Sequence, residues 1–267
     1  MTAPSKVIVL TDLHLLPEGG RIIGLDPFQR VAAAIAHINA HHPDAERVIV
    51  TGDLTHRGDA ASYERVRELL GRLVAPCSVM LGNHDDRDAF FAAFPEAPRD
   101  RDGFAQHVAT VGGYRLVMLD TVKERSPAGT LCARRLAWLG EALADRAPAI
   151  VFMHHPPHPT GFAGMDAIAL DNGDAFHALA ARAGNVRLVV AGHVHRTISG
   201  VHDGLPFAVF KSPVHQQPMV LNAGDTSLSV DEPGAYGILL LGERGVTVHT
   251  DDFGLVTAAE TYSTTSD

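Results

Sequence analysis

Short apolar runs alternate with amphipathic segments along roughly the first two hundred residues of the chain. Runs of apolar and β-branched residues predict buried strands at 6–10, 47–53, 77–83, 149–155 and 186–195. Apolar positions with helical spacing predict helices at 26–42, 60–73, 132–145 and 175–184. Strands and helices that alternate in this way favour a mostly parallel sheet with helices packed against it.

Two parts of the chain depart from this alternation. Residues 103–121 read as two strands around the turn Gly112-Gly113, which predicts a hairpin. Beyond residue 200 only short strands are predicted, at 206–212, 226–232, 236–241 and 245–250. We therefore expect two sheets packed face to face with helices outside. We expect one domain over 1–267, with a motif-bearing part at 1–200, a β-rich tail at 201–255 that completes the second sheet, and a frayed end at 256–267.

Composition narrows the classes of function. The formal net charge is −9 at pH 7 and basic runs are absent, which argues against a large nucleic-acid footprint. Two cysteines make no disulfide framework. The four-residue apolar run near the N-terminus is too short for a signal peptide or a membrane span, so we expect a soluble, cytoplasmic protein. Sixteen histidines are the unusual count.

Polar residues gather where the predicted strands end. They are Asp12 and His14, Asp53, Asn83 and His84, His154 and His155, and His193 and His195. The carboxyl ends of parallel strands meet at one edge of a sheet, so these side chains should converge. The D-x-H and H-x-H spacings place two side chains on one face of an extended segment.

The chemistry of these residues fits a pair of metal ions. Carboxylate and imidazole ligands suit zinc, iron, manganese or cobalt, and Asp53 alone could bridge two ions. Two such ions about 3.5–4 Å apart form a clamp for in-line displacement at phosphorus. Each motif alone also fits a turn, a helix cap or a satisfied buried histidine. The occurrence of all five in this order, each after an apolar strand, favours one metal site.

These residues resemble the five-block pattern of the calcineurin-like metallophosphoesterases. The matching residues are Asp12-Leu13-His14, Gly52-Asp53, Gly82-Asn83-His84, His154 and Gly192-His193-Val194-His195. The match covers roughly residues 6–200. The segments GDLTHRGDAASY, GNHDDR and HHPP look most similar to the bacterial class III cyclic nucleotide phosphodiesterases and the related glycerophosphodiesterases. The resemblance implies an α/β fold, a four-layer α-β-β-α sandwich of two mixed β-sheets flanked by helices.

The resemblance also implies roles for individual residues. Asp12, His14 and His195 would hold one metal, Asn83, His154 and His193 the other, and Asp53 would bridge them. His154 is chosen over His155 because the family's ligand is the histidine of an H-x-P step. His84, next to Asn83, would contact the phosphate and could protonate the leaving group, which makes His84 and Asp53 the expected catalytic residues. His215 either lines the substrate pocket or is a buried structural histidine. Asp85 and Asp86 would orient His84, cap the next turn or meet Arg87.

We therefore expect a binuclear-metal phosphodiesterase that hydrolyses small diesters, cyclic nucleotides or glycerophosphodiesters, by metal-hydroxide attack. A phosphomonoesterase or a nuclease of the same superfamily is the alternative. A non-catalytic scaffold on this fold would lack ligands, whereas all seven positions are filled here. Substrate choice should lie in the rim, at 16–24, 86–90, 158–172 and 212–219, where 159–174 is either a flap or a surface loop. The tail strands could pair across a homodimer or higher homo-oligomer.

Overall fold

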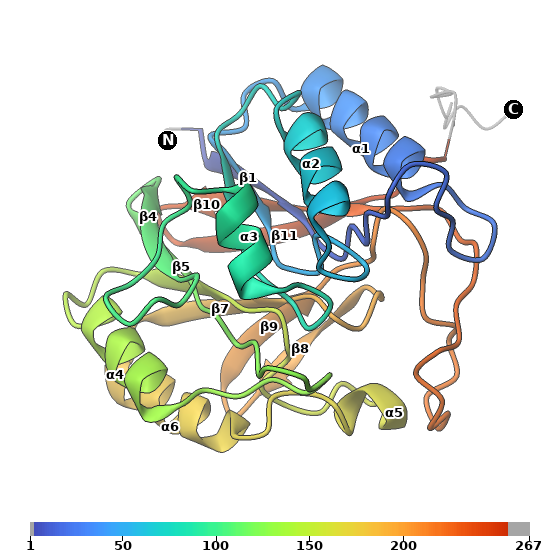
Figure 1. Ribbon diagram of the computed structural model, residues 1–267. Helices are drawn as coiled ribbons and strands as arrows, with labels where there is room; N and C mark the ends of the chain where they lie inside the picture. Colours follow the sequence, from blue (N-terminus) through green and yellow to red (C-terminus); the bar gives the residue numbers. More distant parts are fainter. Residues whose placement is uncertain (1–2, 256–267) are drawn as a thin grey trace, which may run out of the picture.

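Two mixed β-sheets lie between two layers of helices in a computed structural model that describes residues 3–255 (Figure 1). The first sheet has, in spatial order, β11 (Gly245–Asp251), β10 (Tyr236–Gly242), β1 (Ser5–Leu10), β2 (Arg47–Val50) and β3 (Cys77–Val79). The second has β4 (His107–Val111), β5 (Tyr114–Met118), β6 (Ala149–Phe152), β7 (Val186–Ala191), β9 (Leu205–Val209) and β8 (Ile198–His202). β1, β2 and β3 pair in parallel in the first sheet, and β10 and β11 extend it by antiparallel pairing. In the second sheet β5, β6, β7 and β9 pair in parallel, and β4 and β8 pair antiparallel at its two edges.

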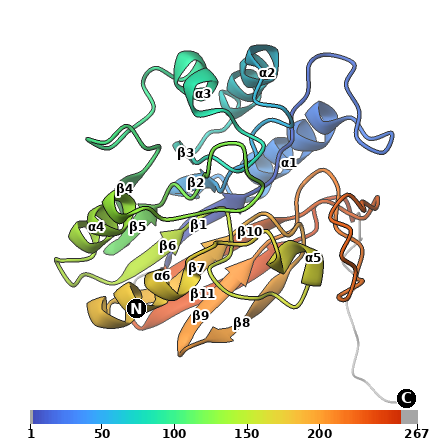
Figure 2. The ribbon, with the colours of Figure 1, turned by 60° about the horizontal axis from the view of Figure 1, so that its bottom comes forward.

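Each sheet carries helices on its outer face only. The first sheet packs against α1 (Pro27–His41), α2 (Ala60–Leu70) and α3 (Arg87–Ala93), and the second against α4 (Ala133–Ala142), α5 (Ala163–Asp166) and α6 (Gly173–Ala183). Figure 1 shows α1, α2 and α3 above the two sheets and α4, α5 and α6 below them, and in Figure 2 the lower helices have come forward. The fold class expected from the sequence is confirmed.

Alternation along the strands produces three separate cores. In β1, Ile8 and Leu10 face the helices, whereas Val7 and Val9 face the other sheet, because side chains of a strand point alternately to its two faces. The same division in β6 and β7 creates the core under α4 and α6. Each parallel strand is therefore buried on both faces, as its continuous apolar sequence requires.

The β-rich tail at 201–255 was expected to complete the second sheet. That expectation is wrong for β10 and β11, which belong to the first sheet. Only β8 and β9 join the second sheet, whereas β10 pairs antiparallel with β1 of the first. The apolar residues of β10 contribute to two of the three cores. Leu239 faces the core between the sheets, and Ile238 faces the core under α1 and α2. A strand of that kind fits only inside a sheet, and β11 covers its other edge.

The segment 226–232 is not a strand, contrary to prediction. Only Val230 pairs, in a single bridge with Gln216, and Leu228 is exposed. Its serines and threonine cannot fill a sheet interior, and they line a cavity instead. The sequence pattern did not predict α3, α5 or β8 either. The expected frayed end at 256–267 lies outside the described residues.

The loops that leave the parallel strands stay in register with one another. The amides of Asp12 and His14 donate to the carbonyls of Gly52 and Asp53, at 3.0 and 2.9 Å. Gly192 N donates to His154 O at 3.0 Å in the second sheet. These bonds hold the segments that follow the strands as one layer at the carboxyl edge. Among residues 3–255 no helix is both long and apolar enough to cross a membrane.

Candidate metal centre

Asp53 lies at the middle of the carboxyl edge, between side chains from both sheets. Its Oδ2 is 3.6 Å from His14 Nε2 and 3.3 Å from His154 Nε2. Asp53, His14 and His154 are almost completely buried. One carboxylate oxygen therefore faces two groups of ligand atoms, as a bridging ligand would.

The first group comes from the loops after β1 and β7. His14 Nε2 lies 3.0 Å from His195 Nε2, and His195 Nε2 lies 3.4 Å from Asp12 Oδ1. Two imidazole nitrogens this close together, next to a buried carboxylate, can bind the same cation. The structure thus brings together the three residues expected for the first metal.

The second group comes from the loops after β3, β6 and β7. His154 Nε2 lies 3.1 Å from Asn83 Oδ1, and the rings of His154 and His193 are 5.1 Å apart. His193 Nε2 is buried and has no hydrogen-bond partner among the described residues. A buried nitrogen without a partner is rare, and a bound divalent ion would satisfy it. The donor set therefore fits a pair of borderline divalent ions.

Hydrogen bonds on the far side of the rings hold two ligands in place. Nδ1 of His154 donates to the Thr51 carbonyl at 3.0 Å, and Nδ1 of His195 donates to the His215 carbonyl at 2.9 Å. A carbonyl can only accept, so these bonds put the proton on Nδ1 and turn the Nε2 lone pair toward the centre. Partners of this kind are typical of metal-bound histidines.

The backbone around the centre is locally strained. Five of the seven expected ligands have positive φ, a region that non-glycine residues seldom occupy: Asp12 (54°), His14 (45°), Asp53 (48°), His193 (71°) and His195 (53°). Such strain costs of order 1–3 kcal/mol for each residue and clusters at functional sites. The strained turns re-aim the side chains from the sheet edge into one cluster.

At two motif positions there is no room for any residue larger than glycine. A Cβ on Gly52, which has φ of +109°, would lie 2.7 Å from His154 Nδ1. A Cβ on Gly82 would lie 2.2 Å from Asp53 Oδ1. The glycines of the G-D and G-N-H blocks therefore let the ligand loops approach one another closely.

The electrostatics of the buried groups favour cation binding. Burial raises the pKa of Asp53, but the nearby charge of His154 outweighs this effect and holds the pKa well below its ordinary value. Burial lowers the pKa of His193 to about 3 and also lowers the pKa of His14. Although burial opposes it, the charge of Asp53 raises the pKa of His154 to about 9, and that of Asp12 raises the pKa of His195. Protons on these two rings therefore balance the buried carboxylates without metal, and a bound cation would take their place.

His84 lies beside this cluster, as expected, and its neighbour His56 was missed. His84 N donates to Asp53 Oδ1 at 2.8 Å, and His84 Nδ1 donates to the His56 carbonyl at 3.0 Å. The rings of His56 and His84 stack 5.1 Å apart, and His56 Nδ1 lies 3.2 Å from His14 Nδ1. The signal that could have found His56 is its place three residues after Asp53, in the same loop.

His155 is buried next to His154 but has other partners. Its Nε2 donates to the Pro127 carbonyl at 3.1 Å, so its Nδ1 accepts from the Thr121 hydroxyl at 2.8 Å. Both nitrogens are therefore used within the protein. Although its ring is also close to His193, this bonding favours a structural role.

The pair His154→Ala and His155→Ala separates these roles. We expect His154→Ala to lose bound metal, because it removes a nitrogen that faces Asp53 and Asn83. We expect His155→Ala to keep its metal and to lose about 1–3 kcal/mol of unfolding free energy, because it leaves buried polar groups unpaired. Metal analysis and urea unfolding of both variants measure this difference. Loss of metal in His155→Ala alone would reverse the assignment.

Asp85 holds the loops of the centre together and does not reach the ligand cluster. Its carboxylate accepts from Leu54 N and Gly82 N at 3.0 Å, from Thr55 N at 3.1 Å, and from the hydroxyl groups of Thr55 and Tyr63. Burial, together with the charge of Asp53, raises the pKa of Asp85 to about 6. Asp86 caps the N-terminus of α3 by accepting a hydrogen bond from Ala89 N at 2.8 Å, which was one of the roles expected for it. Arg87 instead forms an ion pair with Asp120.

We expect Asp85→Ala to destabilise the protein by about 3–5 kcal/mol, because it leaves three buried amides without an acceptor. The matched control is Asp86→Ala, which removes one N-cap and should cost about 1 kcal/mol. Urea unfolding midpoints measure both losses. Equal losses for the two variants would refute the bracing role of Asp85.

A cavity of about 460 Å³ opens directly over the ligand cluster. His215 lines it, and its ring stacks 4.6 Å from that of His195. The rim residues foreseen at 16–24, 158–172 and 212–219 contribute Ile22, Ile23, Met165, Ile168 and Gln217, whereas 86–90 contributes none. Residues 226–229 also line the cavity and were not foreseen. Within 159–174 lies the short helix α5, whose Met165 is buried.

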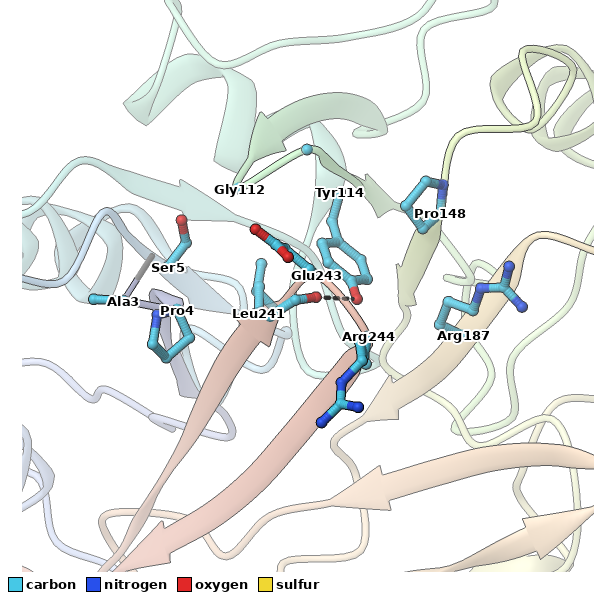
Figure 3. Close-up of a pocket in the computed structure, with 13 residues that line it drawn as sticks. Ala3, Pro4, Ser5, Gly112, Tyr114, Pro148, Arg187, Leu241, Glu243 and Arg244 are labelled. Carbon is cyan, nitrogen blue, oxygen red and sulfur yellow. Dashed lines mark hydrogen bonds between the residues drawn. The ribbon is translucent and has the colours of Figure 1, made fainter. Parts of the chain in front are cut away.

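Figure 3 shows a larger cavity, of about 840 Å³, at the opposite end of the sheets. It lies beside the first residues of β1, β5 and β7, where Tyr114 Oη donates to Gly242 O at 2.9 Å. None of its lining residues is a histidine, an aspartate or an asparagine. The volume of a cavity therefore does not identify the reactive site. The candidate ligands at the carboxyl edge of the sheets identify it.

Comparison with known proteins is consistent with this geometry. A family model described as "Calcineurin-like phosphoesterase" matches residues 5–197. A protein of Rhodopseudomonas palustris named "Probable cyclic nucleotide phosphodiesterase" is 42% identical over 253 residues, which are 93% of this chain and 92% of that protein. A "cAMP/cGMP dual specificity phosphodiesterase" of Mycobacterium tuberculosis is 29% identical over 84% of this chain and 72% of that protein.

Two further proteins are similar to this chain. A glycerophosphodiester phosphodiesterase of Enterobacter lignolyticus is 29% identical over 78% of this chain and 77% of its own length. Among solved structures, a dimetal phosphatase from Danio rerio has a TM-score of 0.69 at 14% identity and covers 93% of this chain and 99% of its own. The structural likeness concerns the fold alone.

Proposed function

The chain belongs to the calcineurin-like phosphoesterase family and is a metal-dependent phosphodiester hydrolase, and on that premise we propose that it hydrolyses cyclic nucleotides at a pair of divalent ions. The observation that carries this proposal is the place of Asp53, whose Oδ2 lies 3.6 Å from His14 Nε2 and 3.3 Å from His154 Nε2. A carboxylate in that position is suited to bridge two cations.

The seven ligands would divide between the two ions as the distances group them. One ion would be held by Asp12, His14 and His195, and the other by Asn83, His154 and His193. Asn83 is a neutral ligand, so it adds no negative charge where an anionic phosphodiester must bind. Iron, manganese, zinc and cobalt all suit this mixed set of oxygen and nitrogen ligands.

Divalent ions bound there supply Lewis acidity, which activates water and withdraws charge from the phosphoryl oxygens. The protein positions the reacting groups around them. His84 donates through Nδ1 to the His56 carbonyl, so Nε2 is the ring atom that can meet the substrate. A protonated His84 would give the proton on Nε2 to the leaving alkoxide.

The cavity over the centre suits a small substrate with an apolar part. Its volume of about 460 Å³ falls in the range of small-molecule sites. Apolar side chains from three segments line it, those of Ile22, Ile23, Met165, Ile168 and Leu228. A nucleobase offers two flat faces to such a lining, and the relative at 42% identity carries a cyclic nucleotide phosphodiesterase name.

Glycerophosphodiesters are the second candidate substrate class. The same cavity has a polar stretch formed by Thr226, Ser227 and Ser229, whose hydroxyl groups could bind those of glycerol. The similarity to a glycerophosphodiester phosphodiesterase supports this alternative.

A substrate panel tests the proposal. Turnover of cyclic AMP, cyclic GMP, glycerophosphoethanolamine, bis(p-nitrophenyl) phosphate, p-nitrophenyl phosphate and plasmid DNA is compared with each metal added. We expect kcat/KM for a cyclic nucleotide to exceed that for the other natural substrates by about tenfold or more. Preference for the monoester or for DNA would favour the phosphomonoesterase or nuclease reading instead.

A further inference from the structure

Three histidines gather outside the metal centre, on the outer side of the second sheet. His158 follows β6, His177 lies in α6 and His202 ends β8, so three separate elements supply them. The ring centroids of His158 are 5.6 Å from His177 and 5.0 Å from His202, and those of His177 and His202 are 5.0 Å apart. The three rings therefore form one cluster, although in this conformation their nitrogens do not all lie within 4.8 Å of one another.

The two buried rings have nitrogens without partners. His158 is 5% exposed, and among the described residues neither of its ring nitrogens has a hydrogen-bond partner. His177 is 8% exposed, and its Nε2 has none either. A buried nitrogen that is left unpaired costs about 1–3 kcal/mol, so such a group calls for a ligand.

His177 offers a nitrogen in the form that binds metal. Burial lowers the pKa of its ring, so the ring is neutral at neutral pH. Its Nε2, which has no hydrogen-bond partner among the described residues, is then free to act as a ligand.

Ring spacing also matches that of the main centre. There the rings of His14 and His195 are 4.9 Å apart, and those of His154 and His193 are 5.1 Å apart. His158 and His202 lie nearly parallel, with 19° between their planes, so one ring must turn to aim its nitrogen at a shared ion. His202 can do so, because its side chain is 40% exposed.

We propose that His158, His177 and His202 form a mononuclear binding site for a borderline divalent metal ion, Zn²⁺ above all, separate from the catalytic pair. Three imidazoles and one open position are a common zinc arrangement. Asp203 could fill the fourth position, since its Oδ2 lies 3.7 Å from His202 Nε2. His177 and Asp203 both line a surface cavity of about 590 Å³ through which an ion could enter.

The chemistry of the site selects the kind of ion. Burial, together with the two neighbouring imidazoles, lowers the pKa of His158 to about 4, so its ring is neutral and can bind metal at neutral pH. Nitrogen ligands suit zinc, nickel, copper and cobalt, whereas Mg²⁺ and Ca²⁺ require oxygen ligands. A bound ion would tie the loop after His154 to α6 and to the β8–β9 hairpin.

Metal-binding stoichiometry tests this proposal. The full chain is stripped of metal, dialysed against Zn²⁺ in the presence of excess Mg²⁺, and analysed for bound zinc in wild type, His202→Ala and His249→Ala. His249 is an exposed histidine on β11 and serves as the matched control. We expect His202→Ala to bind one zinc equivalent fewer than wild type, and His249→Ala to bind as many as wild type.

A thermal measurement gives a second readout. Zinc should raise the Tm of His202→Ala less than that of His249→Ala, because a ligand stabilises only the folded state that binds it. His158→Ala should lose the same equivalent, and if that buried variant does not fold, His202→Ala decides alone. Equal zinc content in wild type and His202→Ala would overturn the proposal.

Discussion

Asp53→Ala is expected to lose both catalytic ions and to lower kcat/KM for a phosphodiester by about 10⁴-fold, because several kcal/mol of transition-state stabilisation depend on the metal pair. The Oδ2 of Asp53 faces both ligand groups. Its removal leaves the buried imidazoles of His14 and His154 without a shared anion. Neither half of the centre should then hold its ion.

Two further variants distinguish loss of the bridge from loss of the fold. Asp53→Asn keeps an acceptor for His84 N, which now donates to Asp53 Oδ1 at 2.8 Å, but removes the charge. Asp86→Ala removes a nearby carboxylate that caps α3 and should keep both metal and activity. Elemental analysis and kinetics on the four proteins give the result. An Asp53→Ala protein that retains its full metal content would show that the bridge is elsewhere.

His84→Ala is expected to keep its metals and to lower kcat by about 10²–10⁴-fold, the usual effect of removing a general acid. The ring is held by the His56 carbonyl and lies over the centre without being one of the seven ligands. The loss should be large for a cyclic nucleotide, whose alkoxide leaves poorly. It should be small for bis(p-nitrophenyl) phosphate, whose leaving group needs no proton.

His84→Gln provides the conservative control. Its amide can still donate a hydrogen bond to the phosphoryl group but cannot transfer a proton. If phosphate contact were the whole role, His84→Gln would restore most of the activity on both substrates. Full activity of His84→Ala on the substrate with the poor leaving group would exclude the general-acid role.

The sequence was sufficient for the parallel core and for the convergence of the ligands. Both follow from local rules, since apolar strands such as 6–10 and 186–191 must be buried and the carboxyl ends of parallel strands share one edge. The positions of Asp12 and His195 at the same centre therefore follow from strand order, although they lie far apart in the chain. The choice between the adjacent residues His154 and His155 as the metal ligand depended on the family resemblance, because both rings are buried and both follow the same strand.

Other features depend on contacts that no local pattern records. β10 lies beside β1 because its apolar residues supply both cores, and the sequence places it only in a β-rich tail. His56 reaches the centre through the fold of a loop, by stacking on His84. His158, His177 and His202 belong to three elements with no shared motif, so only their packing brings them together.

The most direct test of the central claim is the rate of cyclic AMP hydrolysis by the same protein before and after removal of its metals. The metal-stripped protein should be inactive, and reloading with Mn²⁺ should restore cleavage of the diester without conferring comparable cleavage of a phosphomonoester. Full activity in the stripped protein, or a reloaded protein that cleaves no phosphodiester, would contradict the account.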